Sequence, residues 1–183
     1  MNIKTNQAGY SLVEVLVAVM ILMLAIVGPM TIAAKGIKGA SRAKDQTTAF
    51  FLAQEGLEMV VKAREDNALK VYTGSGSDVW DDVLELDGSD SDPECTEEDP
   101  CGVDIEAGGA IFECSSLPCD LQLHSSGRAR YSHQSGGTPT KFRREIVLDV
   151  TLQRIHVRSI VTWGSGLDEV VELSEYIYNI YEN

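Results

Sequence analysis

Residues 9–30 read GYSLVEVLVAVMILMLAIVGPM, an apolar run with one charged side chain, Glu14. From Val15 to Ala34 the chain has twenty consecutive residues without a charge. As a helix rising about 1.5 Å per residue, this run would cross the roughly 30 Å hydrocarbon core of a bilayer. We therefore expect a transmembrane helix. Gly28 and Pro29 predict a kink or a melted turn within it, because proline removes a backbone hydrogen bond.

Glu14 is the unusual residue of this segment. A carboxylate within an apolar helix costs about 2.5–3.5 kcal/mol near the bilayer centre and normally has a partner. The span itself supplies no Lys or Arg within helical reach of Glu14. The partner is therefore expected on another molecule or another part of the chain, and Glu14 is interpreted as a functional residue.

A cleaved secretory signal is the alternative reading of the apolar run. The small residues in TIAAKGIKGAS, residues 31–41, would fit a cleavage site after the run. The apolar region of a signal peptide is only about 7–15 residues long, however, and this one is longer. The pattern favours a segment that is retained.

The stretch GYSLVEVLVA, residues 9–18, resembles the processing site of type IV prepilins and type II secretion pseudoprepilins. In that family a short polar leader ends in Gly, a hydrophobic residue follows, and Glu stands fifth in the mature chain. The resemblance implies cleavage after Gly9 by a membrane prepilin peptidase, which also methylates the new amine of Tyr10. In a filament of parallel helices, Glu14 of one subunit would then meet the Tyr10 amine of a neighbour.

The family resemblance also implies a function and a location. We expect a structural subunit, a minor pilin of a type IV pilus, anchored by one span in the cytoplasmic (inner) membrane and then assembled into an extracellular or periplasmic filament, with its head outside the cytoplasm. The implied partners are other pilin subunits, the prepilin peptidase, the inner-membrane assembly platform and, before assembly, membrane lipid. A type II secretion pseudopilin, and a membrane-anchored adhesin or calcium-binding module, stay open as alternatives.

Beyond Lys35 the apolar residues recur at helical spacing, which predicts that one long helix continues from Tyr10 to about Ala68 and packs one face on a head. The residues of that face are Phe50, Ala53, Leu57, Val60, Val61 and Ala68. The expected parts are a leader at 1–9, a transmembrane or filament-core helix at 10–35, its amphipathic continuation at 36–70, and the head at 71–183.

Three stretches near the C-terminus are rich in β-branched and aromatic residues, at 141–153, 154–163 and 170–181. Their partial alternation predicts three antiparallel strands. Ile146, Leu148, Val150 and Leu152 would share one face, and Trp163 would end a strand that faces the helix. The expected fold is α+β and pilin-like, with the long helix packed on a small antiparallel sheet.

The net charge of −13 is concentrated in residues 81–106, which hold twelve Asp or Glu and no Lys or Arg. With no basic stripe elsewhere, the composition argues against nucleic-acid binding. This segment belongs to an insertion expected at 81–140. Clustered carboxylates suit calcium, which makes Asp87, Asp90, Asp92 and Glu94 calcium candidates. The spacing does not fit an EF-hand, and a solvated acidic loop without a cofactor is favoured.

All four cysteines, Cys95, Cys101, Cys114 and Cys119, fall in this middle region. A pilin topology would put the region outside the cytoplasm, where disulfides are favoured. Zinc is the rival reading, but the C-x5-C and C-x4-C spacings are unlike common structural zinc sites. Four cysteines allow three pairings; the local pairs Cys95–Cys101 and Cys114–Cys119 are preferred without being decided.

The three histidines, His124, His133 and His156, show no spacing typical of a nucleophile or metal site. Trp80 and Trp163 are read as core residues. We do not expect an enzyme.

Overall fold

The computed structural model describes residues 9, 11–74, 95–104, 110–114, 119–151, 153–164 and 166–179. The chain divides into two compact units, Met1–Asp45 and Gln46–Asn183.

One helix, α1, runs from Leu12 to Tyr72 and confirms the predicted long helix. Of the kink or melted turn expected at Gly28 and Pro29, the melted turn is wrong, because the backbone stays helical through Pro29. The Thr31 hydroxyl donates a hydrogen bond of 2.7 Å to the Gly28 carbonyl and so adds a local bond beside the proline. The helix ends at a turn in which Gly74 has a φ of 82°, a conformation that glycine adopts without a steric penalty.

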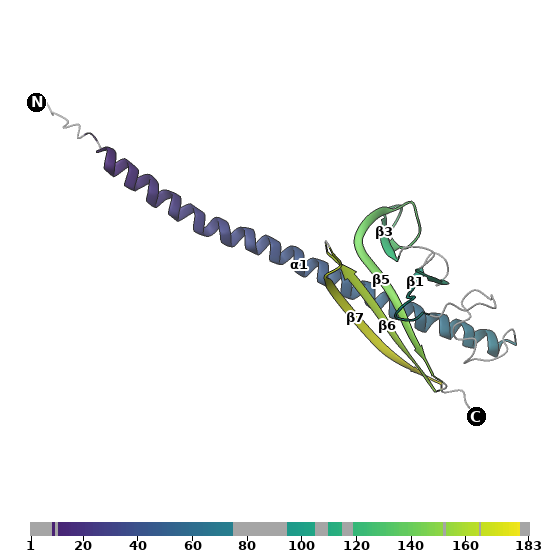
Figure 1. The fold of residues 1–183 in the computed structure, drawn as a ribbon. Helices are drawn as coiled ribbons and strands as arrows, with labels where there is room; N and C mark the ends of the chain where they lie inside the picture. The colour runs from purple at the N-terminus through teal and green to yellow at the C-terminus, as the bar shows by residue number, and fades with distance from the viewer. Residues whose placement is uncertain are drawn as a thin grey trace, which may run out of the picture. The chain divides into compact units, whose positions relative to one another are not determined.

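The second unit contains an antiparallel sheet of seven strands within the described residues (Figure 1). The strands are β1 (Cys101–Asp104), β2 (Ala110–Glu113), β3 (Asp120–His124), β4 (Arg130–Ser132), β5 (Thr138–Val150), β6 (Arg154–Trp163) and β7 (Glu169–Tyr178). The last three confirm the strands predicted from sequence. The four short strands β1–β4 were not predicted, and they make the sheet larger than the three strands expected.

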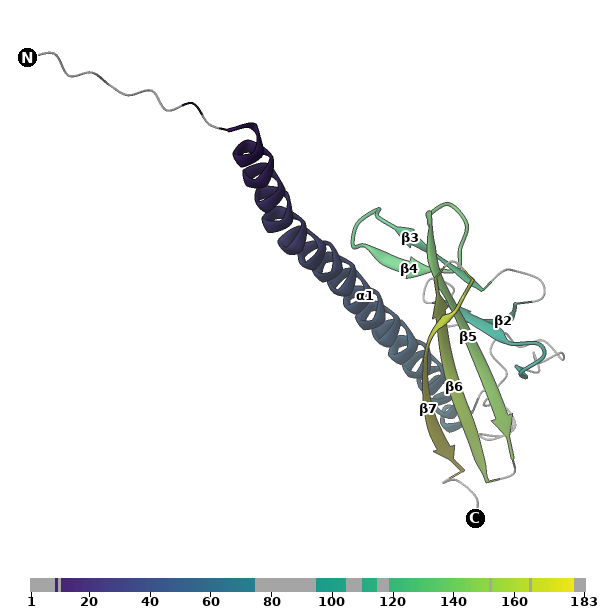
Figure 2. The same ribbon diagram turned by 60° about the vertical axis from the view of Figure 1, so that its left-hand side comes forward.

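Strand β5 is the centre of the sheet. Residues 143–150 of β5 pair with β6, which in turn pairs with β7 along its length. On β5, Thr138, Pro139 and Arg143 pair with β3, and Ile146 pairs with Cys101 of β1. Figure 2 shows β3 and β4 beside the start of β5, with β2 further along. The architecture is α+β and pilin-like, as expected.

The helix buries one face against this sheet within the second unit (Figures 1 and 2). Two apolar clusters form the contact, one around Val60, Ile146 and Val157, the other around Ala53, Phe142 and Trp163. Trp163 thus faces the helix, as predicted. Ile146 and Leu148 are buried too, whereas Val150 on the same predicted face is 48% exposed; Leu152 lies outside the described residues.

The predicted apolar face of the helix needs one correction. Phe50 is 45% exposed and stacks edge-on against the exposed Phe51, while Ala49 and Leu52 are buried. Phe50 is exposed because the face of the helix that packs on the sheet carries Ala49, Leu52 and Ala53 at this level.

Gly56 marks the closest approach of helix and sheet. A Cβ added to Gly56 would lie 2.5 Å from Ser159 Oγ and 3.0 Å from Ile146 Cδ1, and Arg144 Cδ would be 3.2 Å away. Any larger residue at position 56 therefore requires these side chains or α1 itself to shift. A glycine in a helix interior, otherwise unfavourable, is required here by packing.

We expect Gly56→Ala to lower the free energy of unfolding of the head by about 1–2 kcal/mol, since overpacking outweighs the helix-propensity gain. Denaturation followed by the fluorescence of buried Trp163 measures this. Gly39→Ala is the matched control, because its Cβ would meet nothing within 4 Å. Equal stability of the two variants would contradict the packing argument.

Candidate functional site

The predicted processing and assembly segment begins the helix. Gly9 is exposed, Tyr10 lies outside the described residues, and Ser11 precedes the first helical residue. The Ser11 carbonyl accepts a hydrogen bond from the Val15 N–H at 3.2 Å. Ser11 and Glu14 therefore take the N-cap and N3 positions, the spacing of a capping box, a local signal that the sequence analysis missed.

Glu14 lies in the first turn of α1 and is exposed. A carboxylate there is favoured by the partial positive charge of the helix N-terminus. Ala18 and Leu22 follow Glu14 at intervals of four residues, so the three side chains lie along one stripe of the helix. A neighbouring chain that packs on this stripe would meet a single charge on an apolar surface.

The rest of the apolar segment is exposed on all sides within its own unit. Large hydrophobic side chains from Leu12 to Ile32 are between 44% and 76% exposed. By length and composition the helix is able to cross a membrane, with a mean hydropathy of 2.7 in its most apolar window. This surface needs lipid or other apolar helices around it.

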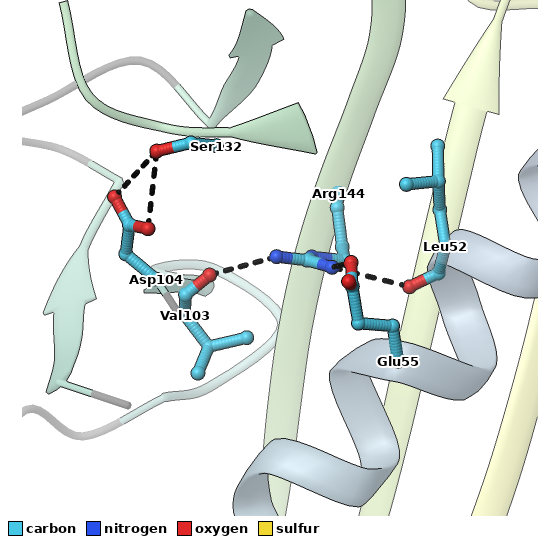
Figure 3. Close-up of polar contacts among 6 residues, drawn as sticks. All are labelled: Leu52, Glu55, Val103, Asp104, Ser132 and Arg144. Atoms are coloured by element: carbon cyan, nitrogen blue, oxygen red, sulfur yellow. Dashed lines mark hydrogen bonds and ion pairs between the residues drawn. The ribbon is translucent and has the colours of Figure 1, made fainter. Parts of the chain in front are cut away.

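A second polar site lies inside the head, where Arg144 of β5 joins the helix to β1 (Figure 3). The Arg144 side chain is fully buried and forms an ion pair of 2.7 Å with Glu55. Its Nη1 also donates to the Leu52 carbonyl at 3.3 Å, and its Nη2 donates to the Val103 carbonyl at 2.8 Å. Burial lowers the pKa of Arg144, and the Glu55 carboxylate opposes that shift.

Two more polar residues surround this cation. Asp104 is buried, and its two carboxylate oxygens accept hydrogen bonds of 3.0 and 3.1 Å from the Ser132 hydroxyl (Figure 3). His133, next in the chain, packs its ring edge-on against Phe112. Burial, and then the charge of Arg144, lower the pKa of His133 to about 4, with Asp104 and the Asp120 backbone opposing. His133 is therefore neutral at ordinary pH.

The four cysteines lie as the two local pairs. The Cα atoms of Cys95 and Cys101 are 5.1 Å apart and those of Cys114 and Cys119 are 5.3 Å apart, with each pair bonded as a disulfide. The first pair closes a loop ahead of β1, and the second connects the end of β2 to the start of β3. Both therefore act on the strands that sequence analysis did not predict.

The calcium candidates Asp87, Asp90, Asp92 and Glu94, like Trp80, lie outside the described residues, so calcium binding stays a prediction. Among the described residues no group of three or more His, Cys, Asp or Glu is placed to hold a metal ion. His124 bonds the Gln134 carbonyl through Nε2 at 3.1 Å. His156 stacks on Tyr176 at 4.3 Å.

Arg144 is the residue that sequence reasoning missed most clearly. The sequence analysis counted it only as one of the basic residues that form no basic stripe. The signal that was present is its place in the apolar alternation of β5, where Phe142, Ile146 and Leu148 are also buried. An arginine at a strand position that faces the core is buried, so hydrogen-bond acceptors for its guanidinium must be buried beside it.

The buried His133 makes the stability of the head depend on pH. The pKa of an unfolded histidine is about 6.5, so between pH 6.5 and about 4 the unfolded chain binds more protons than the folded one. Stability should therefore fall as the pH is lowered through this window, and His133 should add nothing above it. Denaturant midpoints measured from pH 7 to pH 4 in wild type and His133→Gln check this. An unchanged pH slope in the variant would contradict it.

The comparison with known families falls on the N-terminal segment. The family model described as the prokaryotic N-terminal methylation motif matches residues 4–28. No curated protein and no solved structure matches the chain. The motif points to a structural pilin-type protein, which is not an enzyme, and implies cleavage by a prepilin peptidase and assembly with other pilin subunits. The chain thus bears, on an α+β pilin-like fold, the N-terminal hallmark of the type IV prepilin and pseudopilin family.

Proposed function

We propose that this chain is a minor pilin of a type IV pilus, processed after Gly9 and assembled through α1. The observation that carries the proposal is an exposed apolar helix that starts within three residues of Gly9 and carries one acid, Glu14, in its first turn. The methylation motif covers this same segment.

The physical need for assembly comes from the exposed helix surface. In the precursor, lipid covers the apolar side chains, and in a filament other helices take the place of lipid. Cleavage after Gly9 creates an amine on Tyr10, four residues before Glu14. In our proposal the amine of one subunit pairs with the Glu14 carboxylate of its neighbour, and this contact sets the register between subunits. Leaving either charge alone in an apolar core costs several kcal/mol.

The proposed topology puts the leader in the cytoplasm and the head outside it. Two disulfides in the head support that orientation, because such bonds persist in oxidising compartments. The irregular acidic segment at 81–106 favours a minor subunit over a tightly repeated major one. A type II secretion pseudopilin would use the same N-terminal chemistry in a different filament.

Two substitutions of Glu14 separate assembly from helix capping. Glutamine at N3 preserves a capping box but removes the charge, whereas alanine removes both. We expect Glu14→Gln and Glu14→Ala to insert into the membrane at wild-type levels and both to lose at least about tenfold in sheared surface filaments, as an unpaired buried charge implies. Quantitative immunoblots of membrane and filament fractions measure this.

Glu65→Ala is the matched control, since Glu65 lies exposed on the same helix far from its start. It should assemble as the wild type does. Normal assembly of Glu14→Gln would contradict the charge pairing. Recovery of the wild-type protein in a secretion-system filament instead of a pilus would identify it as a pseudopilin.

A further inference from the structure

Strand β1 has little direct pairing with the central strand β5. All four of its residues are buried. It pairs fully with β2, yet its register with β5 is limited, within the described residues, to Cys101 opposite Ile146. Other contacts must keep β1 against the centre of the sheet.

The hydrogen bonds between Asp104 and Ser132 of β4 supply some of those contacts, and the loop closed by Cys95 and Cys101 supplies others. The Cys95 carbonyl accepts a hydrogen bond of 2.7 Å from the Leu148 N–H, two residues beyond the position that Cys101 faces. Within the loop, Glu97 forms an ion pair of 2.7 Å with Arg158 of β6. Both cysteines are buried in the same apolar cluster as Ile146. The loop therefore contacts β5 through both cysteines and β6 through Glu97.

These loop contacts hold the residues of β1 that surround Arg144. Val103, whose carbonyl accepts from Arg144 Nη2 at 2.8 Å, stands two residues after Cys101. Asp104, whose charge favours the guanidinium, is the next residue. If β1 moves away, Arg144 loses both and keeps only Glu55 and the Leu52 carbonyl on α1.

We propose that the Cys95–Cys101 disulfide holds β1 against β5 and thereby keeps Arg144 covered. While the disulfide is intact, β1 stays against β5 and the Val103 carbonyl accepts the hydrogen bond from Arg144. Reduction of the disulfide releases β1 and exposes the guanidinium to water. The reductant is a dithiol: one thiolate attacks a cystine sulfur, the other cysteine leaves as a thiolate, and the second thiol completes the exchange. The dithiol ends as a disulfide and the two cysteines end as thiols.

The second disulfide provides a matched control. Cys119 contributes its carbonyl to the Arg144 backbone N–H at 3.1 Å, but the Cys114–Cys119 bond joins the end of β2 to the start of β3. It closes a loop of similar length, and neither of its cysteines lies in β1. Loss of this bond should leave Val103 over the guanidinium.

The first experiment measures access to Arg144 in the full-length protein in detergent. Phenylglyoxal modifies exposed guanidinium groups, and peptide mass spectrometry gives a rate for each arginine, with exposed Arg128 as the internal reference. Relative to Arg128, we expect the Arg144 rate to rise at least about tenfold in Cys95→Ser/Cys101→Ser, as a local opening of β1 requires. In Cys114→Ser/Cys119→Ser it should stay near the wild-type rate. Continued protection of Arg144 in the first variant, or equal exposure in both, would overturn the proposal.

A thermodynamic cycle covers the case in which the first variant unfolds. Arg144→Met introduces an apolar side chain of similar length and removes the buried charge, so the hydrogen bond from the guanidinium to the Val103 carbonyl of β1 is lost. The Tm loss caused by Cys95→Ser/Cys101→Ser should then be smaller in the Arg144→Met background than in wild type. Equal losses in the two backgrounds, or unfolding in both, would mean that the disulfide acts only as a general crosslink and would overturn the proposal.

Discussion

The packing of the head depends on the buried polar contacts of the Arg144 guanidinium. It extends from the central strand β5 to the helix through Glu55 and the Leu52 carbonyl, and to β1 through the Val103 carbonyl (Figure 3). A buried cation gains little net stability, but it strongly penalises arrangements that leave it unpaired. The buried cation therefore has all its partners only when α1, β5 and β1 are packed together.

The two parts of α1 have different surfaces. From Val15 to Ala34 the helix has no charged residue and its large apolar side chains are exposed, so its surface is suited to lipid or other helices. After Gln46 only one face is apolar, and it packs on the sheet around Gly56. One continuous helix thus belongs to both units, and Arg144 contacts it at Leu52 and Glu55, within the second unit.

Sequence reasoning succeeded where a feature depends on local periodicity or spacing. The long helix, the three C-terminal strands and the position of Trp163 follow from repeats of 3.6 and 2 residues. It failed where packing between distant segments decides. Phe50 fits a helical repeat but is exposed because the sheet approaches at Ala49 and Gly56. Strands β1–β4 are three to five residues long, too short for a periodic signal, and they depend on β5 and the cystines for their place. The acceptors of the Arg144 side chain lie 41, 89 and 92 residues away along the chain, which no local pattern reveals.

The account as a whole rests on the chain being a processed subunit whose helix survives cleavage. Intact-mass and N-terminal peptide mass spectrometry of the protein isolated from its native membranes tests this most directly. The account predicts a chain that lacks residues 1–9 and begins with N-methylated Tyr10, in both membrane and filament fractions. A chain that keeps Met1, or one that begins after the apolar run, would contradict it.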